Sequence, residues 1–263
     1  MPLEWLLYPL LGIVAGVLAG LLGVGGGLVL VAALAWLLPL QGVPVDAAMH
    51  AALATSLASI VITSTASARA HHRRGSVLWP SVAWLLPGLL IGGWLGSRFA
   101  NLLSGEFLRG FVAIYCLIAA VQLSLDWPRP RSEAAIAPQG AGLSFAGIFI
   151  GAVAALVGIG GGSMTVPLLV WRGVAPVRAV GTSSACGIGI GLASAAGYAT
   201  LLPTVPMPAG SLGYVFLPAA IGIALTSMLA APYGTRLAHR LSGKTLKRVF
   251  AAFLLAVALS LAI

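Results

Sequence analysis

A glycine run that occurs twice, each time inside a long apolar segment, limits what this chain can fold into more than any other feature. The copies are Gly23-Val24-Gly25-Gly26-Gly27 and Gly158-Ile159-Gly160-Gly161-Gly162, and their starts are 158 − 23 = 135 positions apart in a chain of 263 residues. Glycine adds backbone freedom and packs no side chain, so a run of glycines destabilises a helix. We therefore expect each run to break a helix.

The apolar segments around the glycine runs are typical of an integral membrane protein. The chain is 60% hydrophobic and 7% charged, whereas soluble domains contain about 25% charged residues. The length allows roughly eight to ten membrane segments. Irregular backbone at membrane depth is tolerated only where protein or water covers it. Glycine-interrupted segments at matching places in two halves indicate a transporter's substrate site.

Further matched motifs extend the repeat along both halves. Ala54-Thr55-Ser56 corresponds to Gly181-Thr182-Ser183, and Gly96-Ser97-Arg98 corresponds to Gly234-Thr235-Arg236. A polar, proline-rich stretch lies between the halves. The sequence therefore predicts an all-α transmembrane bundle with a first repeat over 1–125, a cytoplasmic linker over 126–139 and a second repeat over 140–263.

Apolar runs and helix breakers give the expected helices of each half. The first half is predicted to form helices over 3–22, 28–38, 47–68, 76–97 and 108–125. The second half is predicted to form helices over 140–157, 162–171, 178–201, 210–235 and 245–263.

The charges of the loops predict the orientation in the membrane. The loop from Arg69 to Arg74 is basic and is expected in the cytoplasm, whereas its uncharged counterpart from Leu202 to Pro208 is expected outside. Equivalent loops on opposite sides indicate inverted repeats in the cell inner membrane. If each glycine break is the tip of a hairpin, both termini face outside. Whether the broken segments cross the membrane fully is left open.

The acidic residues argue against a cationic substrate. None of them lies in the middle of an apolar segment, where carboxylates usually bind cations or relay protons. The five are Glu4, Asp46, Glu106, Asp126 and Glu133. The net charge of +9 comes mainly from loop Lys and Arg residues that orient the protein, so nucleic acid is not expected as a partner. No metal or cofactor motif is present.

A site for a small anion is expected where the helices begin again after the breaks. A helix start exposes unpaired N–H groups and a partial positive charge, and glycine lets a ligand approach the backbone. The alternative is that the glycines and hydroxyl residues serve helix packing alone. The residues predicted to bind the substrate are Gly25, Gly26, Gly27, Thr55 and Ser56 in the first half and Gly160, Gly161, Gly162, Ser163, Thr182 and Ser183 in the second.

Three charged or titratable residues have two interpretations each. Arg98 and Arg236 close matching helices and either steer or gate the anion at the two mouths or extend towards lipid headgroups. His50 either carries a proton in a coupled cycle or packs as an ordinary histidine.

Taken together, these motifs resemble the TauE/SafE sulfite exporter family of bacterial membrane proteins. The resemblance covers nearly the whole chain and is strongest from Gly158 to Pro167. The first half lacks a proline at the position of Pro167 and has Ala54 where the second half has Gly181. The resemblance implies a multi-pass permease for small sulfur-containing anions such as sulfite, sulfoacetate and other organosulfonates.

The resulting hypothesis is a secondary transporter of such anions that works by alternating access and is not an enzyme. Its expected partners are the small anionic substrate and membrane lipid, with a homodimer left open. A passive anion channel is one alternative. An intramembrane serine hydrolase using Ser183 or Ser184 with His50 is another, which the absence of a Gly-x-Ser-x-Gly motif disfavours.

Overall fold

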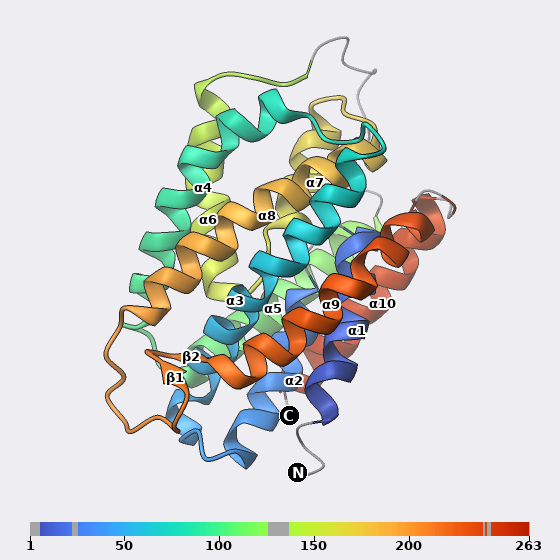
Figure 1. The fold of residues 1–263 in the computed structure, drawn as a ribbon. Coiled ribbons are helices and arrows are strands. Elements are labelled where there is room, and N and C mark those ends of the chain that lie inside the picture. The colour runs from blue at the N-terminus through green and yellow to red at the C-terminus, as the bar shows by residue number, and fades with distance from the viewer. Residues whose placement is uncertain (1–5, 23–25, 126–136, 239, 241–242, 263) are drawn as a thin grey trace.

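The computed structural model describes residues 6–22, 26–125, 137–238, 240 and 243–262, and these form a bundle of helices (Figure 1). The helices of the first half are α1 (Leu7–Leu22), α2 (Gly27–Leu40), α3 (Val45–His72), α4 (Trp79–Ala100) and α5 (Gly105–Ser124). Those of the second half are α6 (Ala141–Val157), α7 (Gly162–Trp171), α8 (Pro176–Ala199), α9 (Leu217–Ala238) and α10 (Gly243–Ala262). The predicted all-α fold is confirmed. Most of the predicted linker, residues 126–136, lies outside the described residues.

Five of the described helices are long and apolar enough to cross a membrane, namely α3, α4, α5, α8 and α9. The four helices that flank the glycine breaks, α1, α2, α6 and α7, are apolar but shorter. Large apolar side chains such as Ile114 and Ile118 of α5 remain exposed. Because lipid is as apolar as these side chains, such exposure is expected of a multi-pass membrane protein.

Two helix pairs pack through glycines at four-residue spacing. Gly12, Gly16 and Gly20 of α1 lie against α9, and Gly88, Gly92 and Gly96 of α4 lie against α6. A Cβ atom placed on Gly88 would lie 1.8 Å from the carbonyl oxygen of Ser144. Any side chain at these positions would push the helices apart, so the glycines allow the close backbone contact that apolar packing in a membrane requires.

The helices of the first half, α1 to α5, make the same main contacts as their counterparts in the second half, α6 to α10. Helices α3 and α8 pack along each other at the centre, and α5 packs against α10. Helix α3 also contacts α2 and α9, just as α8 contacts α7 and α4. The pairs α1–α9 and α6–α4 correspond in the same way. This pattern agrees with the sequence duplication, whereas the inverted orientation of the halves stays a prediction.

Helix α3 is longer than predicted, and the predicted loop from Arg69 to Arg74 is wrong in its first four residues. The helix continues to His72 because its last turn is anchored in the bundle. The buried His71 side chain donates from Nε2 to the carbonyl oxygen of Gly20 at 3.1 Å. The basic residues therefore project mostly from the end of a helix.

The start of α9 also differs from the sequence prediction. Residues 210–216, predicted as helix, contain the antiparallel strands β1 (Ser211–Leu212) and β2 (Val215–Phe216). Gly210 and Gly213 have φ angles of +87° and +56°, which are incompatible with a right-handed helix. The helix therefore begins at Leu217.

Candidate functional site

Each glycine break reverses the backbone immediately before a new helix. Gly26 precedes α2 with φ of 71°, and Gly161 precedes α7 with φ of 73°. Neither N-cap residue supplies a side-chain hydrogen bond, so the first amides of both helices lack a side-chain cap. Helix α2 begins one residue earlier than predicted, which is within the usual spread of helix ends, and α7 begins at the predicted residue, Gly162. Gly25 lies outside the described residues.

The two breaks lie against each other inside the bundle. A Cβ atom on Gly27 would lie 2.3 Å from the carbonyl oxygen of Gly158 and 3.0 Å from Cα of Ile159. It would also lie 2.8 Å from the side chain of Ile60 in the middle of α3. The described residues of both breaks are buried, namely Gly26 and Gly27 in the first and Gly158 to Gly162 in the second. Residues far apart in the sequence therefore meet at one interior point beside α3.

Ser56 connects the two breaks through its hydroxyl group. Its Oγ atom donates towards the carbonyl oxygen of Gly27 at 3.2 Å and towards that of Gly158 at 2.9 Å. A hydroxyl has one hydrogen, so the two carbonyls share it. In this conformation the predicted ligand-binding hydroxyl is directed to the protein backbone. Its second-half counterpart, Ser183, is also completely buried.

The paired threonines have equivalent positions in the two halves. Thr55 Oγ1 accepts a hydrogen bond from the backbone N–H of Phe216, the residue before α9, at 3.0 Å. Thr182 Oγ1 accepts from the N–H of Leu78, the residue before α4, also at 3.0 Å. Each threonine therefore holds the start of a long helix of the bundle. In this conformation both act as caps.

Two residues that were not predicted from the sequence, Tyr115 and Thr165, lie around the second break. Ser163 Oγ, in the first turn of α7, forms a hydrogen bond with the hydroxyl of Tyr115 from α5. Thr165 Oγ1 is buried without a hydrogen-bond partner in the described part of the chain, and a Cβ atom on Gly161 would lie 3.6 Å from it. Thr165 follows the glycine motif closely enough to have been predicted. Tyr115 lies in an unrelated apolar run and gives no such signal.

His50 and Arg98 lie away from the breaks. The Nε2 atom of His50 donates to the carbonyl oxygen of Ala100 at 3.1 Å, and its ring stacks on Tyr214 at 5.2 Å. Arg98 donates to Thr200 Oγ1 at 2.9 Å at the same end of the bundle. His50 precedes Ser56 by six positions, about 9 Å along a helix. The structure therefore does not bring His50 to the predicted substrate site.

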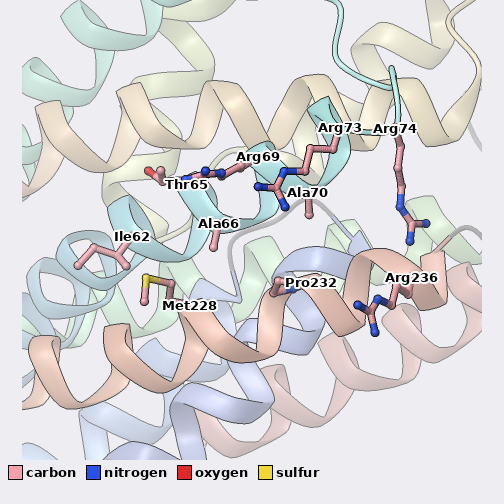
Figure 2. A pocket seen from close by; sticks show the side chains of 10 residues that line it. All are labelled: Ile62, Thr65, Ala66, Arg69, Ala70, Arg73, Arg74, Met228, Pro232 and Arg236. Carbon is pink, nitrogen blue, oxygen red and sulfur yellow. The ribbon is translucent and has the colours of Figure 1, made fainter.

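Two cavities open at opposite ends of α3. One, of about 790 Å³, is lined by His50, both described carboxylates (Asp46 and Glu106) and Arg109. The other, of about 460 Å³, is lined by four arginines, Arg236 among them (Figure 2). None of the residues lining either cavity belongs to a break. The steering roles predicted for Arg98 and Arg236 stay predictions.

The serine–histidine pair considered from the sequence is not assembled at Ser184. Its Oγ atom lies 3.0 Å from Ser67 Oγ and donates to the carbonyl oxygen of Val180 at 3.1 Å. The His50 ring nitrogen Nε2 is directed to Ala100 instead.

A polytopic helical bundle in which two glycine-broken segments meet in the interior is the architecture of a membrane transporter. The sequence profile described as Sulfite exporter TauE/SafE matches residues 8–261, so the chain belongs to this family of membrane transporters. No solved structure matches the chain.

Relatives of similar length are found in bacteria and archaea. A probable membrane transporter protein of Haemophilus influenzae is 36% identical over 97% of both chains. A probable membrane transporter protein of Xylella fastidiosa is 31% identical over 94% of this chain and 91% of its own. One of Methanocaldococcus jannaschii is 26% identical over 95% of this chain and 93% of its own.

Proposed function

We propose that the protein is a secondary transporter that carries a small sulfur-containing anion, such as sulfite or an organosulfonate, across the cell inner membrane by alternating access. The family membership supports the substrate class. The observation that carries the proposal is the contact of the two breaks, with Gly27 against Gly158. It places the start of α2 against the end of α6, four residues before α7 begins at Gly162, and neither α2 nor α7 has a side-chain cap at its start.

The chemistry of this point suits an oxyanion. The first amides of α2 and α7 would donate hydrogen bonds to it, and the partial positive charge of both helix starts would stabilise it. The unpartnered Thr165 hydroxyl supplies a further donor beside Gly161. Ser56 and Ser163 would turn from their present partners to the ligand. No fixed positive charge is needed, so binding stays weak enough for release.

In an alternating-access cycle, the structure in which the two breaks contact each other would be a closed state. As the breaks separate, the site would open in one state to the carboxylate-lined cavity at one end of α3 and in the other state to the opposite side of the membrane. The equivalent helix contacts of the two halves support a mechanism in which two similar halves move against each other. In Figure 1, α2 lies towards one end of the bundle and α7 towards the other, as inverted repeats require. His50, in the carboxylate-lined cavity, is the candidate for carrying a coupled proton.

Flux into liposomes tests the proposal. Purified protein should give sulfite or sulfoacetate uptake that saturates and shows counterflow. Both are expected of a carrier, because its binding site faces one side of the membrane at a time. A passive anion channel would give uptake without counterflow. Failure to move any sulfur anion under a pH gradient or a membrane potential would refute the transporter hypothesis for this substrate class.

A pair of hydroxyl variants tests the site. Thr165→Val removes a hydroxyl that has no protein partner, so it should leave the melting temperature unchanged while lowering flux about tenfold, the effect of one lost hydrogen bond to a charged ligand. Ser194→Ala is the matched control because its buried hydroxyl is also unpartnered in the described part of the chain but belongs to α8. Equal flux in both variants would remove Thr165 from the site.

A further inference from the structure

The cavity at the C-terminal ends of α3 and α9 concentrates positive charge without a balancing acid. Arg69, Arg73 and Arg74 come from the end of α3, and Arg236 comes from α9 (Figure 2). The structure describes two carboxylates, Asp46 and Glu106, and both line the cavity at the other end of α3. The four guanidinium groups are therefore available for an anionic ligand.

The same cavity continues along an apolar groove. Ile62 of α3 and Met228 of α9 face each other at the end away from Arg74 and Arg236 (Figure 2), and they are 41% and 44% exposed. Between Arg73 and Ile62 there are 73 − 62 = 11 steps of helix, or about 16 Å. That is close to half of a hydrocarbon core of about 30 Å. The cavity as a whole, from its arginines to Ile62, thus spans the depth of about one leaflet.

We propose that this cavity binds an anionic glycerophospholipid of the leaflet at this end of the bundle, which is the end predicted to be cytoplasmic. The headgroup phosphate binds Arg73, Arg74 and Arg236, and an acyl chain lies along Ile62 and Met228. Guanidinium groups bind phosphate in pairs of hydrogen bonds, and basic pockets between membrane helices suit anionic headgroups.

The groove favours a lipid over a free oxyanion. A dissolved anion has no apolar part, so it gains nothing from contact with an apolar surface that reaches the middle of the bilayer. A zwitterionic lipid would bring its own cation close to four arginines. With a phosphate bound, the charge of Arg236 is neutralised, so this assignment replaces the steering role predicted for Arg236. The bound lipid links α3 to α9.

Lipid titration followed by native mass spectrometry tests the headgroup half. The detergent-solubilised protein should bind phosphatidylglycerol at a concentration about tenfold lower than phosphatidylcholine with the same acyl chains. The double variant Arg73→Gln/Arg236→Gln should remove that preference. Arg178→Gln, an exposed arginine at the start of α8 at the same end of the bundle, is the control and should keep it. Equal binding of the two lipids by the wild type would overturn the proposal, as would an equal effect of the control.

A second pair of variants tests the apolar half and separates a lipid from a free anion. Met228→Trp fills the groove and should weaken phosphatidylglycerol binding about tenfold, whereas Leu229→Trp should not, since Leu229 is exposed on α9 but does not line the cavity. Sulfite or inorganic phosphate at about a hundredfold excess should not displace the lipid. Displacement by either anion, or insensitivity to Met228→Trp, would show an aqueous anion vestibule and refute the lipid site.

Discussion

The hydroxyl oxygen of Ser56 lies 2.9 Å from the carbonyl oxygen of Gly158, a residue of the other half of the chain. Because the same hydroxyl also contacts the carbonyl of Gly27 at 3.2 Å, one side chain of α3 holds both breaks. A buried carbonyl that loses its donor carries the cost of leaving water. Ser56 therefore helps to keep the two breaks together.

Replacing Ser56 with alanine should destabilise the protein by about 1–3 kcal/mol, since two buried carbonyls lose their shared donor. Thermal unfolding in detergent measures this loss. Ser124→Ala is the control, because Ser124 is exposed on α5 and bonds only to Ala120 of its own helix. Its expected cost is below about 0.5 kcal/mol. Equal stability of the two variants would contradict the bridging role of Ser56.

Alanine at Gly26 should be more destabilising than alanine at Gly161. Both positions have positive φ, which costs an L-residue about 1–2 kcal/mol. At Gly26 the new Cβ would also meet backbone of Ala15, with the carbonyl oxygen at 2.3 Å and Cα at 2.7 Å. At Gly161 its closest neighbour, at 2.4 Å, is the terminal methyl group of Ile190, which can rotate away.

Gly110 in α5 provides a control for the comparison of Gly26→Ala with Gly161→Ala. Gly110 is helical, and a Cβ atom there would meet nothing within 4 Å, so Gly110→Ala should stabilise the protein by about 0.5–1 kcal/mol. Chemical or thermal unfolding of the three variants gives the order. If Gly161→Ala proved the more damaging change, the backbone contact at Gly26 could not be the deciding cost.

The features that the sequence predicted well are those with local causes. The apolar runs set the helices, and the glycine runs set the breaks before α2 and α7, within one residue of the observed starts. The α3 end was missed because its cause is not local. Charged residues after an apolar run are typical of a loop, yet His71 is held by the carbonyl of Gly20, a residue 51 positions away.

The sequence repeat predicted that Thr55 and Thr182 occupy equivalent positions, but it did not predict the hydrogen bonds that they form. Each accepts a hydrogen bond from an N–H group of a distant residue, Phe216 or Leu78, and no pattern in the sequence indicates such a partner. Repeated hydroxyls in two halves are equally typical of a binding site and of a structural cap. The three-dimensional contacts are needed to tell these apart.

Removing either threonine hydroxyl should have the same effect on stability. Thr55→Val and Thr182→Val each leave a buried N–H group without its acceptor, at a cost of about 1–3 kcal/mol. Thr55→Ser and Thr182→Ser keep the acceptor and should recover most of that loss. Melting temperatures of the four variants measure this. A large cost at one position alone would show that the two halves use their threonines differently.

The predicted orientation can be tested with single cysteines at opposite ends of the bundle. Arg74 follows α3, and Leu202, which is 90% exposed, follows α8 at the other end. The native Cys116 and Cys186 are completely buried, so they should not react with a maleimide. Basic loops favour the cytoplasm. A membrane-impermeant maleimide should therefore label Leu202→Cys in intact spheroplasts and Arg74→Cys only in inside-out vesicles. Labelling in the reverse pattern would invert the topology and place the arginine-lined cavity outside.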